Sequence, residues 1–329
     1  MSELRITYDR HGPAQEVLKL EEVPLVDLNP GQLRIRMDYA NINPSDLGMI
    51  GGTYGRLPQL PAIAGREGVG TIESIHPETR TSLKTGDRVR MPESLGAWRS
   101  HVNCEPDGLI RVPSGIPAEQ AATLFINPPT ALLLLEEFGN LNPGDWVIQN
   151  AANSSVGIWV IQLCKLRGLH SVNLVRRNEL AAPLQALGAD VVIEDNDDNI
   201  KQLKAMTGGS LAKLALNSVG GASVIRLIRG MADGGTCVTF GGMVGDPIRF
   251  PTRNLIFNDV HLCGFWMDKW MRSHSQDEIQ ALYNRLFDLV KTHGLSSPIA
   301  GTYSLREVLE AIQVASSPRM GKVLLSNVP

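Results

Sequence analysis

Short apolar strands that alternate with helices between residues 146 and 265 constrain the fold of this sequence more than any other feature. The predicted strands cover residues 146–150, 171–175, 191–193, 213–217, 236–240 and 260–265, and the predicted helices cover residues 155–167, 179–187, 200–206 and 223–231. Strands that are apolar along their whole length and alternate with helices form a parallel sheet covered on both faces. This region therefore predicts a doubly wound α/β layout, which is the kind that binds nucleotides.

The first 120 residues have a different texture, with short β-like runs punctuated by glycine and proline. Regular spacing of such runs predicts a mostly β domain, in the form of a compact barrel. The texture changes near Pro117, where a helical pattern begins and leads to a turn over residues 142–145. After the alternating region come amphipathic helices over residues 277–292 and 305–316, and a closing β-like run, KVLLS. A chain of 329 residues agrees with two domains, because domains usually have ~100–200 residues.

The composition excludes several classes of protein. Hydrophobic residues make up 43% of the chain and charged residues 20%, which excludes a disordered or fibrous chain. With 31 basic and 34 acidic side chains the formal net charge is −3, so nothing electrostatic favours nucleic acid or an anionic membrane as a partner. No apolar run approaches the ~20 residues that cross a bilayer, and the first ten residues resemble neither a signal sequence nor a transit peptide. We therefore expect a cytoplasmic protein.

The four cysteines and seven histidines are scattered along the chain. They form no CxxC pair and no pair of histidines at the spacing of metal ligands. A structural zinc site needs clustered thiolates or imidazoles, so we expect no metal site. Cys164 and Cys237 lie in apolar segments, where an unpaired cysteine usually behaves as a small buried hydrophobic residue.

A candidate phosphate-binding turn follows the first strand of the alternating region, in the run NAANSSVG. Glycine-rich turns between a strand and a helix let backbone N–H groups and the helix dipole approach a pyrophosphate. Only Gly157 remains here of a Gly-x-Gly-x-x-Gly pattern, and the other positions carry small or hydrogen-bonding residues such as Asn153. A helix that is merely capped by Ser154 or Ser155 is the alternative. The strand before the turn and the apolar helix after it favour a dinucleotide site.

Two arginines follow the second predicted strand. An NAD site carries an acidic residue ~20 residues after the glycine turn, where it binds the ribose 2′-hydroxyl. At that place this sequence has Arg176, Arg177 and Asn178, and the first acidic residue is Glu179. Two guanidinium groups can bind a 2′-phosphate through charge-assisted hydrogen bonds. A pair of solvated arginines is the alternative, but their position in place of the expected acid favours NADPH.

With these residues placed, the chain resembles the medium-chain dehydrogenase/reductase superfamily along essentially its whole length. Within that superfamily it is most similar to the mitochondrial-type 2-enoyl thioester reductases, also called trans-2-enoyl-CoA reductases. The similarity is carried by motifs in a common order: NINPSDLGMIGGTYG (41–55), LPAIAGREGVG (60–70), AATLFINPPTA (121–131), GDWVIQNAANSSVG (144–157), NLVRRN (173–178), LALNSVGG (214–221), GGTCVTFGGM (234–243) and NLIFNDVHLCGFW (254–266). Their number, order and spacing make coincidence improbable.

The resemblance implies a GroES-like, mostly β substrate domain over residues 1–120 and 290–329, and a Rossmann domain over residues 121–289. It implies zinc-independent reduction of trans-2-enoyl thioesters, on CoA or acyl carrier protein, by NADPH. In that reaction hydride goes to the β-carbon, and Tyr54 assists protonation of the α-carbon. A homodimer joined through the edge of the Rossmann sheet, at residues 260–265, is also implied. The implied cofactor contacts are Asn127, Asn153, Ser154, Ser155, Val156, Arg176, Arg177, Asn178, Phe240, Gly241, Gly242, Met243, Phe265, Trp266, Met267, Asp268 and Lys322.

Several of these residues have an ordinary structural alternative. Asn127 also suits a turn or a helix N-cap, and the glycines at 241–242 suit a tight turn. Phe265 and Trp266 also suit core packing. Lys322 suits a solvated lysine near the chain end, and Tyr54 suits an amphipathic surface position. The resemblance is therefore what favours a functional role for each of them.

The chain departs from the family pattern at a few positions. Asn178 stands where relatives often have a further charged or basic residue, which weakens the expected grip on the phosphate. Arg66 stands where the reductases usually have Asn and the zinc alcohol dehydrogenases have His, and the sequence assigns it no role. Ser45 lies in the segment where the zinc branch has Cys. Serine and arginine supply neither a thiolate nor an imidazole, so a catalytic zinc is not expected.

Two other functions remain open from the sequence. An NADPH:quinone or α,β-unsaturated ketone reductase on the same scaffold would share the cofactor site and need no dedicated proton donor. A non-catalytic NADPH-binding protein would bind the cofactor without turning over any enoyl substrate.

Overall fold

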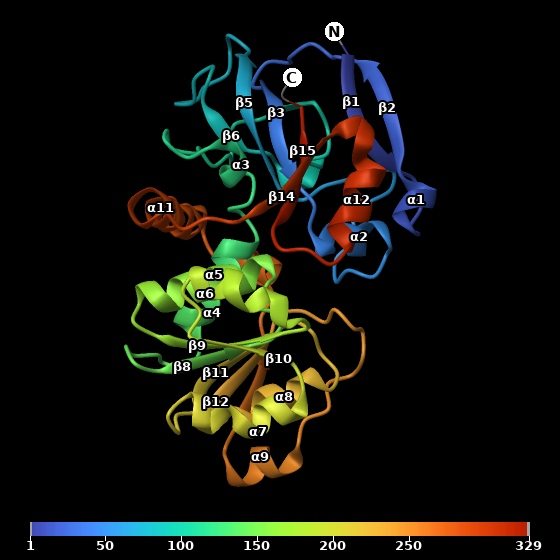
Figure 1. The fold of residues 1–329 in the computed structure, drawn as a ribbon. Coiled ribbons are helices and arrows are strands. Elements are labelled where there is room, and N and C mark those ends of the chain that lie inside the picture. The colour runs from blue at the N-terminus through green and yellow to red at the C-terminus, as the bar shows by residue number, and fades with distance from the viewer. Residues whose placement is uncertain (1, 328–329) are drawn as a thin grey trace. The chain divides into compact units, whose positions relative to one another are not determined.

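The computed structural model describes residues 2–327 of the chain, which form two compact units (Figure 1). Unit 1 contains the chain up to Ile126 together with the chain from Gln276 onward, and unit 2 contains Asn127–Ser275. Unit 2 is thus an insertion in the sequence of unit 1. None of the helices in the described residues is long and apolar enough to span a membrane.

Unit 1 is built mainly from two β-sheets, which confirms the prediction of a mostly β domain. The smaller sheet has the order β2-β1-β4, and the larger has the order β14-β15-β3-β5-β6 with β7 paired to β3. The strands are β1 (Ser2–Tyr8), β2 (Lys19–Pro24), β3 (Leu33–Asn41), β4 (Ala62–Ile63), β5 (Gly68–Ile75), β6 (Arg88–Arg90), β7 (His101–Cys104), β14 (Ile299–Ser304) and β15 (Lys322–Ser326). The helices are α1 (Ala14–Val17), α2 (Pro44–Ile50), α3 (Ala118–Ala121), α11 (Gln276–His293) and α12 (Val308–Ser316), with 3₁₀ turns η1 (Glu93–Leu95) and η3 (Leu305–Glu307).

The central strand β3 shows how the sequence produces this unit. Leu33, Ile35 and Met37 are fully buried, and the arginines between them are partly exposed. This period of two residues is that of a strand with one face on the core. Helix α12 closes the same core with Ala311 and Ile312.

Unit 2 is a six-stranded parallel sheet of order β10-β9-β8-β11-β12-β13. Its strands are β8 (Trp146–Gln149), β9 (His170–Val175), β10 (Val191–Glu194), β11 (Ala212–Asn217), β12 (Met231–Thr239) and β13 (His261–Gly264). Its helices are α4 (Asn127–Glu137), α5 (Ser155–Leu166), α6 (Ala181–Ala186), α7 (Asp197–Met206), α8 (Ser223–Arg229), α9 (Thr252–Phe257) and α10 (Met267–Ser273), with a 3₁₀ turn η2 (Asn178–Leu180). Helices α4, α5 and α6 cover one face of the sheet, and α7 and α8 cover the other (Figure 1). The predicted doubly wound Rossmann layout is confirmed, with its strand order reversing between β8 and β11.

Every strand and helix predicted between residues 146 and 265 occurs, with differences at the ends. The largest difference is in β12, which begins at Met231 rather than at residue 236. Its first half contains Gly234 and Gly235, and glycine is a weak strand former that hides a strand from sequence patterns. Pairing of Met231 with Ala212 of β11 extends the strand there. As predicted, Cys164 and Cys237 are buried.

Both boundaries between the units differ from the prediction, and the first lies at Asn127 rather than at residue 121. The larger difference is at the second boundary. The Rossmann domain is expected over residues 121–289, whereas unit 2 ends at Ser275 and the whole of α11 belongs to unit 1. The reason is aromatic packing, because Tyr283 of α11 lies with its ring 5.1 Å from that of Phe125 and donates its hydroxyl hydrogen to the Phe125 carbonyl at 2.9 Å. Phe287, one turn further along, meets the same ring edge-on at 6.2 Å.

Candidate active site

The predicted phosphate turn lies between β8 and the N-terminus of α5, as expected. Ser154 is the N-cap of the helix, and its Oγ accepts a hydrogen bond from the Gly157 amide at 3.1 Å. Ser154 therefore also caps the helix, as the alternative interpretation of this segment expects. Ala151 adopts a φ of +46°, a left-handed conformation that glycine usually fills in such turns. A Cβ on Gly157 would lie 2.5 Å from the Ala152 carbonyl oxygen, so only glycine lets helix and turn pack this closely.

The turn lies at the point in the sheet where the strand order reverses, between β8 and β11. Asn150, directly after β8, donates to Asn217 Oδ1 at the end of β11 at 2.8 Å and accepts from the Ser218 amide at 2.8 Å. These bonds tie together the carboxyl ends of the two central strands, where nucleotides bind in such sheets. In the described part of the chain, the Oγ atoms of Ser155 and Ser218 are buried without a hydrogen-bond partner. Buried hydroxyls without partners are uncommon, and a phosphate or ribose oxygen here would satisfy them.

The basic residues predicted to hold a 2′-phosphate follow the end of β9. Arg176 and Asn178 are exposed, and Arg177 is partly exposed and paired with Glu179 at 3.1 Å. Both arginines therefore remain accessible to an anion at the carboxyl edge of the sheet. Together with the turn and the two serine hydroxyls, they fit a phosphorylated dinucleotide.

The other predicted contacts in unit 2 also follow strand ends. The segment from Phe240 to Met243 leaves β12, with Gly241 so close to Ser218 that an added Cβ would lie 3.0 Å from the Ser218 carbonyl oxygen. Phe265 and Trp266 follow β13, and Met267 and Asp268 begin α10. The Phe265 ring packs edge-on against Phe138 at 6.1 Å, so its core-packing alternative also applies. Asn127 is the first residue of α4.

Tyr54 lies in unit 1, in a loop that follows α2. Its backbone amide and that of Thr53 donate to the Gly48 carbonyl at 3.2 and 2.8 Å, which fastens the loop to the helix. Its hydroxyl oxygen accepts a hydrogen bond from Arg66 Nη1 at 2.9 Å. Arg66 is 3% exposed and also binds Glu93 through Nε and Nη2, at 2.8 and 2.7 Å.

Two buried carboxylates, those of Asp46 and Glu67, belong to the same region of unit 1 as Tyr54 and Arg66. Asp46 accepts from the backbone amides of Asn43 and Arg66 at 2.6 and 2.8 Å. Burial raises the pKa of the Asp46 carboxyl to about 7, against the effect of those hydrogen bonds and of Arg66. Glu67 is fully buried and accepts four hydrogen bonds, from the side chains of Asn41 and Asn43 and from the backbone amides of residues 125 and 126.

Lys322, predicted as a cofactor contact, lies in unit 1 at the start of β15. It is 5% exposed, and its Nζ donates to Asn43 Oδ1 at 2.6 Å. It is therefore buried rather than solvated, which removes the structural alternative considered for it. Burial lowers the pKa of the Lys322 ammonium to about 8, although Glu67 and Asp46 attract its charge.

Sequence patterns missed most of this cluster. The sequence patterns point to none of Asp46, Glu67 and Glu93, and they assign no role to Arg66. The signal for Asp46 is its position three residues after Asn43, which together form a capping box at the start of α2. The contact between Arg66 and Tyr54 has no signal in the sequence, because it depends on how two loops fold.

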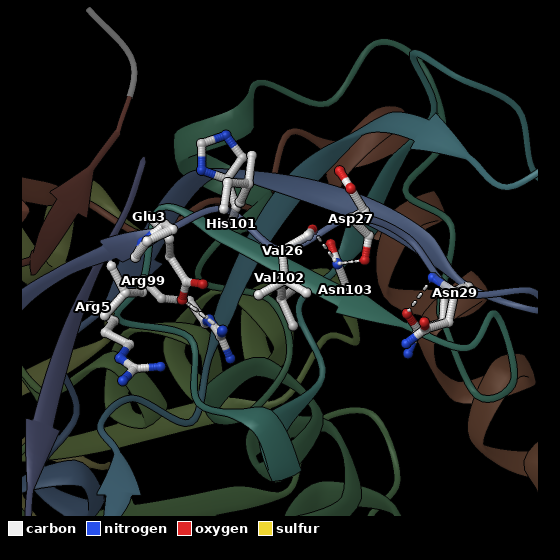
Figure 2. A pocket seen from close by; sticks show the side chains of 13 residues that line it. Glu3, Arg5, Val26, Asp27, Asn29, Arg99, His101, Val102 and Asn103 are labelled. Carbon is white, nitrogen blue, oxygen red and sulfur yellow. Dashed lines mark hydrogen bonds and ion pairs between the residues drawn. The ribbon is translucent and has the colours of Figure 1, made fainter. Parts of the chain in front are cut away.

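A cavity of about 250 Å³ elsewhere in unit 1 contains none of the predicted site residues (Figure 2). Glu3 and Arg99 form an ion pair of 2.6 Å in its wall, and Asn103 donates to the Val26 carbonyl at 3.0 Å. Arg5 pairs with Glu21 at 2.9 Å. Because it contains none of the residues predicted to bind the cofactor or to donate the proton, this cavity is not the candidate site.

Comparison with known proteins bears on both units. A family model described as an alcohol dehydrogenase GroES-like domain matches residues 29–114, and one described as a zinc-binding dehydrogenase matches residues 155–287. The human mitochondrial enoyl-[acyl-carrier-protein] reductase is 39% identical over 319 residues, which are 95% of this chain and 85% of the human protein. The chain belongs to the enoyl thioester reductases of the medium-chain dehydrogenase/reductase superfamily. The Dictyostelium discoideum member is 40% identical over 289 residues, covering 85% of this chain and 82% of its own.

Solved structures of enoyl thioester reductases and of a quinone oxidoreductase have the same fold. The mitochondrial 2-enoyl thioester reductase heterodimer Etr1p/Etr2p from Candida tropicalis matches with a TM-score of 0.88 and 26% identity, over 99% of this chain and 100% of that chain. A complex of Etr1p with NADP and crotonyl-CoA matches with a TM-score of 0.89 and 27% identity, over the same shares. A mycobacterial quinone oxidoreductase matches with a TM-score of 0.83 and 25% identity, over 98% of this chain and 99% of its own.

The zinc in the description of the family model that matches residues 155–287 has no ligand set among residues 2–327 of this chain. No three His, Cys, Asp or Glu side chains in that range lie together in a way that could hold a metal ion. Ser45 and Arg66 stand at the positions that carry Cys and His in the zinc branch, and neither is a zinc ligand.

The close packing at Gly157 makes a prediction about stability. We expect Gly157→Ala to lower the free energy of unfolding by ~2 kcal/mol or more, because the added Cβ overlaps the Ala152 backbone. The matched control is Gly242→Ala, where a Cβ meets nothing within 4 Å, and we expect a change below ~0.5 kcal/mol. Urea unfolding followed by circular dichroism measures both, and equal stability of the two variants would contradict the assignment of Gly157 to close packing.

Proposed function

We propose that this chain reduces trans-2-enoyl thioesters to acyl thioesters with NADPH, and that Tyr54 assists protonation of the α-carbon. The observation that carries the proposal is the anchored phenol of Tyr54, in a chain that is 39% identical to an enoyl-[acyl-carrier-protein] reductase over 95% of its length. One relative is named for enoyl-[acyl-carrier-protein], and a similar structure is a complex with crotonyl-CoA. The thioester is what these two compounds share. The acyl chain is therefore expected on CoA or on acyl carrier protein.

Unit 2 holds the cofactor in this proposal. The turn before α5 presents backbone amides and the Ser155 hydroxyl to the pyrophosphate, since the first amides of a helix have no partner within it. Arg176 and Arg177 bind the 2′-phosphate. When bound, NADPH supplies the hydride.

Unit 1 supplies the proton. Hydride addition at the β-carbon places negative charge on the thioester oxygen and the α-carbon, and a phenol can donate to that carbon directly or through one water. The loop bonds to Gly48 and the bond from Arg66 hold the Tyr54 oxygen in place. A fixed donor adds to the rate because less freedom is lost when the reaction occurs.

We also propose a homodimer joined at the outer edge of the sheet of unit 2. Strand β13 is the edge strand, and an exposed edge of this kind pairs readily with another chain. Exposed apolar side chains occur on this strand and on the helix that precedes it in the chain, with Phe257 of α9 72% exposed and Leu262 of β13 41% exposed. The similar reductase from Candida tropicalis is described as an Etr1p/Etr2p heterodimer, which supports the proposal.

The proposed reaction is tested by NADPH oxidation with crotonyl-CoA and with a longer trans-2-enoyl-CoA. We expect turnover by the wild type and a loss of ~100-fold or more in kcat for Tyr54→Phe, because positioned acid catalysis typically contributes ~10²–10⁴-fold. Tyr303→Phe is the matched control, a partly exposed tyrosine of the same unit, and should retain full activity. A quinone is assayed in parallel. Turnover of the quinone alone would replace the proposal with the quinone reductase alternative, and tight NADPH binding without any turnover would favour a non-catalytic protein.

Cofactor choice tests the two arginines. We expect replacement of both Arg176 and Arg177 by Gln to raise the KM for NADPH ~10-fold or more and to leave the KM for NADH unchanged, because charge-assisted bonds to the 2′-phosphate are lost. Arg229→Gln, an exposed arginine elsewhere in unit 2, should change neither value. Equal rises in KM for both cofactors would show that the arginines do not recognise the 2′-phosphate.

The dimer is tested by light scattering. We expect the wild type to have the mass of two chains, and the Ile256→Lys/Leu262→Lys double variant to have the mass of one, because two charges would be buried at the interface. Leu309→Lys, on α12 of unit 1 with a similar exposure of 43%, should stay dimeric. A monomeric wild type at working concentration would refute the dimer.

A further inference from the structure

Arg66 is the residue that the sequence leaves without a role, and in the structure it has three anchors. Its guanidinium binds Glu93 through Nε and Nη2, at 2.8 and 2.7 Å. Its backbone amide donates to Asp46 Oδ1 at 2.8 Å. Its remaining terminal nitrogen, Nη1, donates to the Tyr54 hydroxyl oxygen at 2.9 Å. The side chain is 3% exposed, so the direction of every donor is set by the surrounding protein.

These anchors and Tyr54 form a closed ring of contacts that runs through α2. Asp46 lies on α2, and the Gly48 carbonyl of the same helix accepts the backbone amides of Thr53 and Tyr54. Arg66 is thus held to α2 through Asp46, and Tyr54 is held to α2 through its own backbone. The bond between Arg66 and Tyr54 closes this ring of contacts, which fixes the phenol oxygen from two sides. The guanidinium carbon also lies 4.8 Å from the centre of the Tyr54 ring, a cation–π contact that restricts rotation of the ring.

The chemistry of the guanidinium also gives this bond a direction. Arginine has five N–H donors and no acceptor, so the Tyr54 oxygen can only accept from it. The hydroxyl hydrogen of Tyr54 must therefore point toward an acceptor other than Arg66. With its oxygen held by Arg66 and its hydrogen directed elsewhere, the Tyr54 hydroxyl is oriented for proton donation. The positive charge beside the oxygen stabilises the negative charge that remains after the proton has left.

The charge of Arg66 is compensated without the help of the tyrosine. Glu93 binds Arg66 through Oε1 and Arg90 through Oε2, the latter at 3.3 Å. A buried guanidinium needs such a partner, because an unpaired buried charge is strongly destabilising. The ion pair with Glu93 therefore accounts for the stability of Arg66 at this position. The bond to Tyr54 is an additional contact that the ion pair does not require.

We infer that Arg66 is the positioning residue for Tyr54, setting the place and the direction of its proton and stabilising the charge left on its oxygen. This inference rests on the proposed function, because it concerns the same proton transfer. Arg66 acts through Tyr54, so its effect must disappear when the Tyr54 hydroxyl is absent.

A double-mutant cycle with crotonyl-CoA and NADPH tests the inference on the full-length protein. The variants are Arg66→Gln, Tyr54→Phe and the combination of the two. We expect Arg66→Gln to lower kcat ~10-fold or more, since it removes a charged hydrogen bond, and to leave the KM for NADPH within ~2-fold of the wild type. In the Tyr54→Phe background the same substitution should change kcat by less than ~2-fold.

Two further variants separate positioning from structure. Arg90→Gln removes the other ion pair of Glu93 and has no hydrogen bond to Tyr54, so it should lower the thermal midpoint and leave kcat within ~2-fold. Arg66→Lys retains the charge and one donor and should recover part of the lost kcat. It also serves as the test variant should Arg66→Gln fail to fold, as judged by circular dichroism.

The outcomes distinguish this inference from the proposed function. Loss of kcat by the same factor in both backgrounds, or no loss in either, would overturn the role of Arg66 while enoyl reduction by the wild type stands. An equal loss in Arg90→Gln would show that the ion pair network is what matters, and would overturn it as well. No enoyl turnover by the wild type would overturn the proposed function, and the role of Arg66 would fall with it.

Discussion

The carboxylate of Glu67 is fully buried, and it receives hydrogen bonds from three segments of unit 1 that are far apart in the sequence. They are the end of β3 through Asn41, the N-cap of α2 through Asn43, and the backbone at residues 125–126. A buried carboxylate is stable only when donors replace the water that it loses. Four donors meet that need here, so the three segments can move apart only at a large cost in free energy. The loop of Tyr54 is attached to this frame through α2.

Acidic and basic groups are paired in the cluster around Tyr54. Asp46, Glu67 and Glu93 are acidic, Arg66 and Lys322 are basic, and hydrogen bonds or close approaches connect them. Pairing of this kind lets ionisable groups remain buried next to the candidate proton donor. Arginine and lysine side chains bring positive charge to this region, and Arg66 directs its donor at the candidate proton source.

Much of unit 2 could be predicted from the sequence because its signals are local. A strand that is buried on both faces of a sheet is apolar along its whole length, as at residues 171–175. The pattern is therefore visible in consecutive residues. Gly157 and the pair Arg176 and Arg177 follow strands at fixed spacing, so their place at the edge of the sheet follows once the strands are predicted. The boundary at Ser275 was not predicted, because it depends on Tyr283 packing on Phe125, a contact across 158 residues.

The sequence by itself therefore determined the six strands of unit 2, the helices that alternate with them from β8 to β12, the turn before α5 and the family to which the chain is similar. Each of these rests on neighbouring residues or on motifs at constant spacing. Only the tertiary structure decided that Arg66 binds Tyr54, that Lys322 is buried against Asn43, and that Glu67 joins three segments. Those contacts join loops and strand ends whose relative positions are set by packing of the whole unit, and side-chain hydrogen bonds between distant segments leave no periodic signal in a sequence.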